Sequence, residues 1–484
     1  MRKAIISFIL ILIIATCRLT AHSGKPQYRV IIDTDCAIDD FRAITLLLAS
    51  SEVEVLGITT SDGTLNPGDG LKKIELLLRD FHHEGIPTAS GDIMLKRIPE
   101  WRDINNKIYW SKGELAEKTG NNLYAADFII ETTESETKPV TLICLGSLTN
   151  IVKAIRKDPS IRKHIQRIVW FNRTPDITEG TNYNFDKKSA DFILNSGIKV
   201  DIVSNPVQDI FKLNSILMDS ISNINSIYAR KIFHVHQQKE LRNQLHKGFL
   251  NLWDDLVSLY LVSPEMFNIN NTPGYDSVRT VIPADTSRIK QEYTEVLDID
   301  RNIESKMFRS FPVDPGLYRE DVAGVMNEII HKHGLEEWKL GILANELHGH
   351  LGIYAIVGVK MGLRAREFYN IGVDDIKIFT YAGRTPPLSC MNDGLQVSTG
   401  GTLGHGLIFL ADDSENLPAA LFSYKDRTII IKLKDKYLNI VRNDIRRCIS
   451  EHGNLTEDYW KCVRRLAIDY WSQWDRNIIF DLDY

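Results

Sequence analysis

The stretch "RVIIDTDCAIDDFRAITLLLA", residues 29–49, joins an apolar run to a helix-like apolar period and places Asp33, Asp35, Asp39 and Asp40 at the junction. One or two acidic residues suffice to cap a helix or to complement its dipole. Four carboxylates this close together repel one another unless a cation or a shared proton offsets their charge. The stretch therefore predicts a strand followed by a helix, with a cation-binding or catalytic site where the strand ends.

The same alternation of β-rich runs and helical periods continues to about residue 206. The further strands are expected in "EVEVLGITTSDG", "GIPTASG", "PVTLICLGSLTN", "QRIVWFN" and "VDIVSNP", with helices such as "GLKKIELLLRDFHHE" and "KKSADFILNSG" between them. This order predicts an α/β fold with a mostly parallel, doubly wound (Rossmann-like) sheet. Because ligands bind at the carboxyl ends of such strands, we expect the site there.

The remainder of the chain reads differently. Residues 213–333 look mainly helical, with late strands or an extended flap expected at 269–287 and 292–300. Polar residues 331–339 then mark a boundary, followed by one helix over 340–369, a strand pair, a glycine-rich turn and an aromatic, basic tail that reads as a docking helix. We therefore expect two domains, 24–333 and 336–484, the second a smaller α+β unit.

Composition limits the classes of partner. The chain has 484 residues, 25% of them charged, and a net charge of -5. No basic excess is available to neutralise phosphates, so nucleic acid is not an expected partner and a small or neutral substrate is.

The first 23 residues are predicted to be an export signal. Arg2 and Lys3 precede the short apolar stretch "AIISFILILIIA". The sequence leaves two forms open: a lipoprotein signal ending before Cys17, which would anchor the chain to a membrane, and plain cleavage near Ala21 or Ser23. In either case we expect a periplasmic or membrane-anchored protein, with the cell surface included.

The cysteines are sparse, and no pair of them has zinc-finger spacing. Cys448 and Cys462 could pair in an oxidising compartment, or stay as two buried thiols. The sequence does not decide between them.

Oxygen ligands alone favour a hard cation at the aspartate cluster. Ca²⁺ accepts irregular geometry, whereas Mg²⁺ demands tighter octahedral order. A cation beside a free carboxylate indicates hydrolysis, because the metal polarises water and the carboxylate removes its proton.

The motif Asp33-Thr34-Asp35-x-x-x-Asp39-Asp40 resembles that of the inosine-uridine nucleoside hydrolase family. "LGITT" with "DG", "TLICLGSLTNI" with "DPSI", "RIV", and "NYN" before "KKSADFILNSG" follow that family's order, from about residue 28 to the low 300s. The resemblance implies a calcium-dependent hydrolase of the N-glycosidic bond of ribonucleosides. It also leaves a homo-oligomer open, although an appended domain would cover some of the surfaces.

The resemblance implies roles for individual residues. Asp35 would be the general base and a calcium ligand, with Asp40, Asp254 and the Leu145 carbonyl as the other ligands. Asp39 would contact ribose hydroxyls, and Asp33 would support the ligands.

The expected contacts with the base depart from the family pattern. Trp253 stands where many members have a histidine that protonates the leaving base; it could stack on a purine, or be a core aromatic on a helix. Trp101 and Trp110 could supply the second face of a base sandwich.

The expected contacts with the sugar depart from it as well. Asn182 stands where a glutamate is usual, and Asn184 keeps the amide expected to hold the ribose 5′-hydroxyl. Asp62 could contact further sugar hydroxyls.

Cys36 and Ala37 replace the Pro-Gly that usually follows the second aspartate of the motif. The turn after Asp35 must then tolerate a side chain where glycine is typical.

The segments "NELHGHLGIYAIVGVKMG" and "SCMNDGLQVSTGGTLGHG" resemble the E-type domain of formylmethanofuran dehydrogenase. Gly352 and Gly401 stand where that family has cysteines. A remnant zinc site of His350, Cys390 and His405 and a metal-free structural or binding module both stay open. The glycine-rich turn could cradle a phosphate or simply pack under the preceding helix.

Three functions follow from these observations. The leading one is an exported, calcium-dependent, purine-tolerant ribonucleoside hydrolase. The alternatives are a non-catalytic calcium-dependent receptor for a nucleoside or carbohydrate, and a metal-dependent activity in the second domain.

Overall fold

The computed structural model describes residues 28–113, 123–172, 176–205, 211–300, 307–411 and 416–484. The signal segment and both cleavage sites expected from the sequence lie outside these residues. Within the described ranges, no helix combines the length and the apolarity that crossing a membrane requires.

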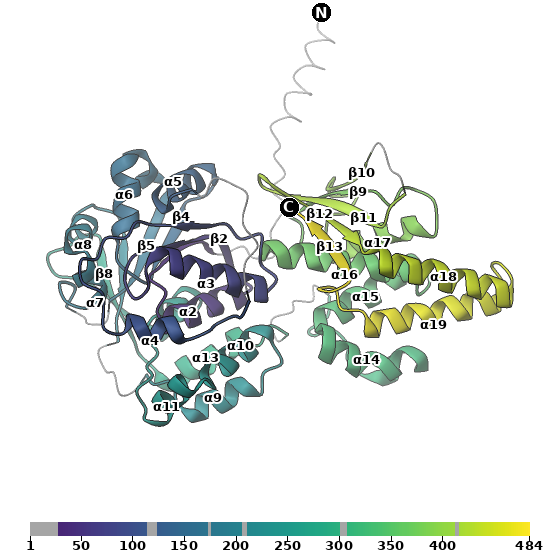
Figure 1. Ribbon diagram of the computed structural model, residues 1–484, viewed down its shortest axis with the longest axis horizontal. Helices are drawn as coiled ribbons and strands as arrows, with labels where there is room; N and C mark the ends of the chain where they lie inside the picture. The colour runs from purple at the N-terminus through teal and green to yellow at the C-terminus, as the bar shows by residue number, and fades with distance from the viewer. Residues whose placement is uncertain (1–27, 114–122, 173–175, 206–210, 301–306, 412–415) are drawn as a thin grey trace, which may run out of the picture.

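An eight-stranded sheet forms the centre of the first unit, in the order β3-β2-β1-β4-β5-β6-β8-β7 (Figure 1). Its neighbouring strands are parallel except β7, which pairs antiparallel with β8. The strands are β1 (Tyr28–Thr34), β2 (Val53–Thr60), β3 (Thr88–Ser90), β4 (Val140–Cys144), β5 (Ile165–Phe171), β6 (Val200–Val203), β7 (Phe267–Asn271) and β8 (Val278–Pro283). The predicted mostly parallel sheet is confirmed, and so are the late strands within 269–287.

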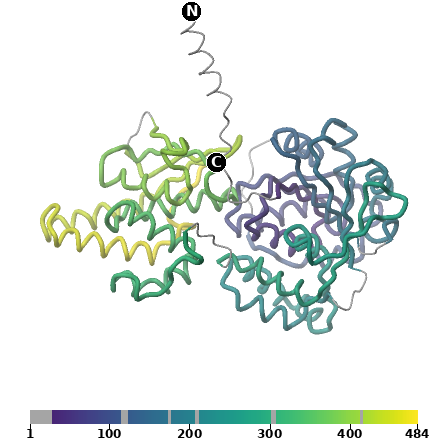
Figure 2. The backbone as a smooth tube through the Cα atoms, turned by 180° about the vertical axis from the view of Figure 1, so that it is seen from behind, coloured from purple at the N-terminus to yellow at the C-terminus, as the bar shows by residue number. Residues whose placement is uncertain are grey.

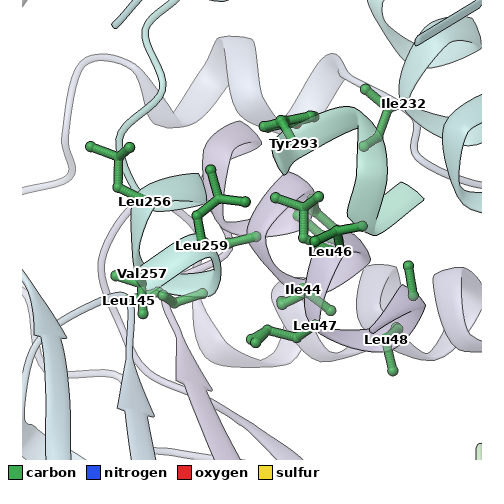
Figure 3. Close-up of a cluster of buried hydrophobic side chains, with 14 of the residues drawn as sticks. Ile44, Leu46, Leu47, Leu48, Leu145, Ile232, Leu256, Val257, Leu259 and Tyr293 are labelled. Atoms are coloured by element: carbon green, nitrogen blue, oxygen red, sulfur yellow. The ribbon is translucent and has the colours of Figure 1, made fainter. Parts of the chain in front are cut away.

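Helices cover both faces of this sheet because successive strand residues point to opposite sides. Val30 and Ile32 of β1 face one core, whereas Ile31 between them faces the other. The first core is closed by α2 (Ile38–Ala49), α3 (Pro67–Asp80), α9 (Ser215–Ser222), α10 (Ile227–His236), α11 (Lys239–His246), α12 (Asp255–Val262) and α13 (Thr286–Leu297). The second is closed by α5 (Ala125–Ser135), α6 (Thr149–Lys157) and α8 (Lys187–Leu194). Figure 3 shows side chains of α2, α10, α12 and α13 meeting in the first core.

Residues 292–300 are not a late strand or flap, as the sequence suggested, but mostly the end of α13. Asp285 caps this helix by accepting hydrogen bonds from the backbone N–H groups of Ser287 and Arg288. The buried residues Ile289, Tyr293 and Leu297 recur every four positions, which is helical spacing.

A five-stranded sheet, in the order β10-β9-β11-β12-β13, forms the second unit with its own core. Its elements are α14 (Glu320–His333), α15 (Leu335–His348), α16 (Ile353–Tyr369), β9 (Lys377–Thr380), α17 (Met391–Thr399), β10 (Ile408–Leu410), β11 (Ala419–Tyr424), β12 (Arg427–Leu433), α18 (Asp435–His452), α19 (Glu457–Gln473) and β13 (Phe480–Asp483). The expected docking helix is α19, whose Trp471 stacks on Trp338 with 5.1 Å between the ring centroids. Figure 2 shows the two units side by side.

Two features of this unit differ from the sequence reading. The helix expected over 340–369 is broken: α15 ends at His348, Gly349 adopts a left-handed φ of 79°, and α16 starts at Ile353. Helix α14 packs with the second core through Val322, Met326 and Ile329, although the expected boundary at 333 placed it with the first unit.

Cys448 of α18 and Cys462 of α19 form a disulfide, so the structure selects the first of the two readings left open.

The second unit docks against the end of the first sheet where β2 begins. Lys425 pairs with Glu54 (2.9 Å), and Tyr424 donates a hydrogen bond to the same carboxylate. Arg364 pairs with Glu84 (2.9 Å) just before β3. Because Glu54 lies near the amino end of β2, the carboxyl ends of the strands remain clear of this interface.

Candidate active site

The aspartate cluster lies where the strand order of the first sheet reverses. β1 pairs with β2 on one side and with β4 on the other, so the chain departs in opposite directions from this point. Asp35 follows β1, Leu145 follows β4, and Asp39 and Asp40 lie in the first turn of α2. Asp254 immediately precedes α12 and comes from more than two hundred residues further along the chain.

These residues line one cavity of about 370 Å³, within the usual size range of small-molecule sites. Of the predicted site residues, its lining includes Asp35, Asp39, Asp40, Leu145, Trp101, Asn182, Trp253 and Asp254. The sequence missed Ile104, Asn105, Gln244, Phe249 and Asn251, which complete the wall. These residues lie outside any recognisable motif, so only the fold brings them to the cavity.

Three of the carboxylates are close enough to share one ion. Asp39, Asp40 and Asp254 each offer an oxygen, and these atoms lie within 4.8 Å of one another. One oxygen of Asp40, Oδ2, accepts hydrogen bonds from the Thr34 hydroxyl (2.6 Å) and from the backbone N–H of Cys36 (3.0 Å). The other, Oδ1, is buried without a partner, as is Oδ1 of Asp254.

Burial and mutual repulsion make this cluster costly to ionise. Burial raises the pKa of Asp40 and of Asp254 well above the usual carboxyl value, and the neighbouring carboxylates raise both further. Burial also raises the pKa of Asp33 to about 7. Unpartnered, buried carboxylate oxygens of this kind fit a hard divalent cation, which would satisfy them and offset their charge.

Asp35 is held in place by backbone groups around it. Its Oδ2 accepts a hydrogen bond from the backbone N–H of Thr64 at 2.6 Å. Burial raises the pKa of Asp35, and this hydrogen bond opposes the rise. A Cβ on Gly63 would lie 2.1 Å from Asp35 Oδ2, and a Cβ on Gly146 would lie 2.9 Å from Asp35 Cβ. Glycine at these two positions therefore makes room for the carboxylate.

The turn after Asp35 is left-handed at Cys36, whose φ is 64°. This agrees with the expectation that a side chain occupies a position where glycine is typical.

Asn182 fixes the carbonyl expected to be a ligand. Its Nδ2 donates to the carbonyl oxygen of Leu145 (2.7 Å) and to that of Phe171 (3.1 Å). Asn184, the expected partner of the ribose 5′-hydroxyl, is instead exposed on α7 (Thr181–Phe185) and does not line the cavity. Residues two apart in a helix point in different directions, so both amides cannot face one site.

Two further expectations about substrate contacts are wrong. Trp110 is buried and stacks on Phe41 of α2 with ring centroids 5.1 Å apart, so it is a core aromatic. Asp62 does not line the cavity, because its carboxylate accepts hydrogen bonds from Arg102 (2.8 Å) and from the backbone N–H groups of Met94 and Leu95 (2.7 Å each).

Trp101, in contrast, lies at the cavity and is 44% exposed. Its Nε1 donates to the Thr64 hydroxyl at 3.1 Å. Trp253 lines the same cavity, beside Asp254. The two tryptophans thus supply aromatic surface around a carboxylate cluster.

The zinc site predicted for the second unit is not assembled. His350 contacts the ring of Trp460, and His405 Nδ1 lies 2.8 Å from the Gly400 carbonyl oxygen. Over the described part of the chain, the aspartates form the only group of three potential ligands close enough to hold a metal, so His350, Cys390 and His405 do not meet.

Comparison with known proteins places both parts of the chain. Residues 30–310 match the profile of the inosine-uridine preferring nucleoside hydrolases. Residues 347–463 match the profile described as FmdE, molybdenum formylmethanofuran dehydrogenase operon.

Individual relatives are distant. Uridine nucleosidase 1 of Arabidopsis thaliana is 26% identical over 43% of this chain and 65% of its own length, so less than two thirds of that relative is covered. A pyrimidine-specific ribonucleoside hydrolase of Escherichia coli is 26% identical over 49% of this chain and 80% of its own. A solved plant nucleoside hydrolase is 20% identical with a TM-score of 0.49, over 56% of this chain and 99% of its own. Because the first profile covers more than half of the 484 residues, the chain belongs to the inosine-uridine preferring nucleoside hydrolase family.

Proposed function

We propose that the protein hydrolyses the N-glycosidic bond of ribonucleosides, with Ca²⁺ at the aspartate cluster. The observation that carries this proposal is the pair of buried, unpartnered oxygens, Asp40 Oδ1 and Asp254 Oδ1, at the reversal point of a nucleoside hydrolase sheet.

Asp35, Asp40, Asp254 and the Leu145 carbonyl are the proposed ligands, and their all-oxygen chemistry suits calcium. Calcium, when bound there, would supply charge that orients ribose hydroxyls and lowers the pKa of water. Asp39 faces the same cavity and is the proposed acceptor for ribose hydroxyls.

Asp35 is the proposed general base. The backbone N–H of Thr64 holds one of its oxygens, which fixes the direction of the carboxylate. Asp35 takes the proton of a water molecule whose oxygen attacks C1′ of the ribose. The bond from C1′ to the base nitrogen breaks, and its electron pair leaves with the base.

The aromatic walls are the proposed base subsite. Trp101 and Trp253 line the cavity together with Ile104 and Phe249, and these large apolar surfaces suit a stacked base. We therefore propose that purine nucleosides are accepted, although two of the relatives are named for uridine or pyrimidine substrates.

We also propose that the mature chain acts outside the cytoplasm. The disulfide between Cys448 and Cys462 supports an oxidising compartment. Fractionation of the source cells tests this, since recovery of the chain only in the cytoplasm would contradict it.

The activity is tested by incubating the calcium-loaded protein with inosine, adenosine, uridine and cytidine and by separating free base from nucleoside. We expect base release, with purines among the substrates. Replacement Asp35→Asn should lower kcat by roughly 10²–10⁴-fold, the usual contribution of a general base.

A matched control is Asp62→Asn, a buried aspartate that does not line the cavity. It should retain calcium binding and the pH dependence of kcat. Calcium-dependent binding of nucleosides without any base release would instead identify a receptor and contradict the hydrolase proposal.

A further inference from the structure

A buried ion pair lies directly behind the aspartate cluster. Arg42 of α2 and Asp255 of α12 meet through two hydrogen bonds, from Nε to Oδ1 at 2.8 Å and from Nη2 to Oδ2 at 2.9 Å. Their side chains are only 2% and 0% exposed. An arginine in the otherwise apolar stretch "FRAITLLLA" is the sequence signal for this pair.

Neighbouring groups complete the hydrogen bonding of the pair. Arg42 Nη2 also donates to the carbonyl oxygen of Asn251 (2.8 Å), and the Tyr293 hydroxyl donates to Asp255 Oδ1 (2.9 Å). His236 Nδ1 lies 2.7 Å from the Ile232 carbonyl oxygen and must donate to it, which leaves Nε2 facing Arg42 Nη1 as an acceptor at 3.5 Å. The network thus fastens α2 to the segments that carry these groups.

The pair joins the two segments that supply the aspartate cluster. Arg42 lies two residues after Asp40, and Asp255 directly follows Asp254. The remaining contacts between α2 and α12 are largely between apolar side chains, which attract without fixing one register (Figure 3). A planar guanidinium that grips a carboxylate with two hydrogen bonds does fix a register.

We propose that Arg42 and Asp255 are positioning residues that set the separation of Asp254 from Asp39 and Asp40, and thereby the affinity of the cluster for calcium. This inference rests on the proposed function, which places Ca²⁺ at the cluster. A buried ion pair gains little net stability over apolar residues of similar size, so its value here is geometric.

The interdomain pair of Arg364 and Glu84 offers a matched control. Arg364 is 3% exposed, donates to both oxygens of Glu84 (2.9 and 3.0 Å) and also to the His82 carbonyl oxygen (3.0 Å). It therefore copies the hydrogen bonding of Arg42 but lies at the interface with the second unit.

The test is calorimetric titration of Ca²⁺ into the full chain, the double variant Arg42→Met/Asp255→Asn and the control Arg364→Met/Glu84→Gln, each checked for folding by circular dichroism. We expect the first double variant to bind Ca²⁺ at least about tenfold more weakly than the parent, and the control to bind within about twofold. A folded Arg42→Met/Asp255→Asn variant with parental affinity would overturn the inference while leaving the proposed function intact.

If that variant does not fold, Arg42→Lys replaces it, because lysine keeps the charge but not the two-pronged geometry. We expect it to weaken Ca²⁺ binding by at least about threefold, and unchanged affinity would overturn the inference. A parent chain that binds no Ca²⁺ would contradict the proposed function itself, and the positioning role of the pair with it.

Discussion

Cys36 carries a side chain through a backbone conformation that favours glycine. Its φ of 64° lies between Asp35 and the start of α2, at the centre of the candidate site. The thiol also packs against Gly70, where an added Cβ would lie 2.7 Å from the sulfur. The turn therefore depends on a strained residue and on a glycine in α3 that accommodates it.

We expect Cys36→Gly to be more stable than Cys36→Ala by about 1 kcal/mol, because both lose the sulfur but only alanine keeps the cost of a left-handed φ. Urea denaturation measures the difference. Cys144, buried in β4, is the control: there alanine should be the more stable replacement. Equal stability of the two Cys36 variants would argue against strain in the turn.

At the scale of elements, α4 (Arg102–Lys107) is attached to the cavity by side chains at its first residue. Arg102 donates to the Asp62 carboxylate (2.8 Å) and to the Thr64 carbonyl oxygen (3.1 Å). The preceding residue, Trp101, forms part of the proposed base subsite. The arginine therefore holds one wall of the cavity against the turn that fixes Asp35.

We predict that Arg102→Met raises the KM for nucleosides by roughly tenfold and leaves Ca²⁺ affinity unchanged, because the wall moves while the ligands do not. Steady-state kinetics and calcium titration measure the two effects. Arg97→Met, on the same segment but 91% exposed, should change neither. A loss of Ca²⁺ affinity in Arg102→Met would show that α4 supports the cluster instead.

Prediction from sequence succeeded where a local pattern determines the structure. The strands of the first sheet and the aspartates after β1 follow from short, contiguous signals. Residues 292–300 were misread because "EYTEVLDID" contains β-favouring residues, whereas tertiary burial selects the helical spacing of Tyr293 and Leu297.

The substrate side of the site was harder to predict because it depends on where side chains point. Asp62 and Trp110 have residue types suited to a ligand, but their partners Arg102 and Phe41 occupy them in the folded chain. Such pairings link segments that no spacing rule relates.

At the scale of the whole molecule, the two cores meet away from the aspartate cluster. The interface runs through Glu54 and Glu84, and each unit has its own hydrophobic cluster. Stability changes in one unit should therefore leave the chemistry of the other intact.

The disulfide provides a test of this separation. Cys448→Ser/Cys462→Ser opens a link between residues 14 apart, and we expect a loss of about 3 kcal/mol in the stability of the second unit. Calcium affinity should not change. Cys390→Ser, which alters a free cysteine, is the control for thiol loss. Weaker calcium binding in the disulfide variant would mean that the two units are coupled.

Calcium should stabilise the protein more at higher pH. In the ion-free chain the pKa values of Asp40 and Asp254 are raised, so the stability they contribute is complete below the unfolded carboxyl value and is lost as pH rises through the folded value. Bound calcium favours the ionised carboxylates and offsets that loss.

The increase in Tm on replacing chelator by Ca²⁺ should therefore be larger at about pH 8 than at about pH 6. Thermal unfolding monitored by circular dichroism measures it, with Asp254→Asn as the control expected to show a smaller increase. An increment that falls as pH rises would contradict a carboxylate site.

The central claim is that one ion is held where β1, β4 and α12 converge. A crystal structure of the calcium-loaded protein, with the ion located by anomalous scattering, tests it most directly. We predict a single Ca²⁺ at about 2.3–2.6 Å from oxygens of Asp35, Asp40 and Asp254 and from the Leu145 carbonyl oxygen. An ion held without Asp35, or no ion at this position, would contradict the claim.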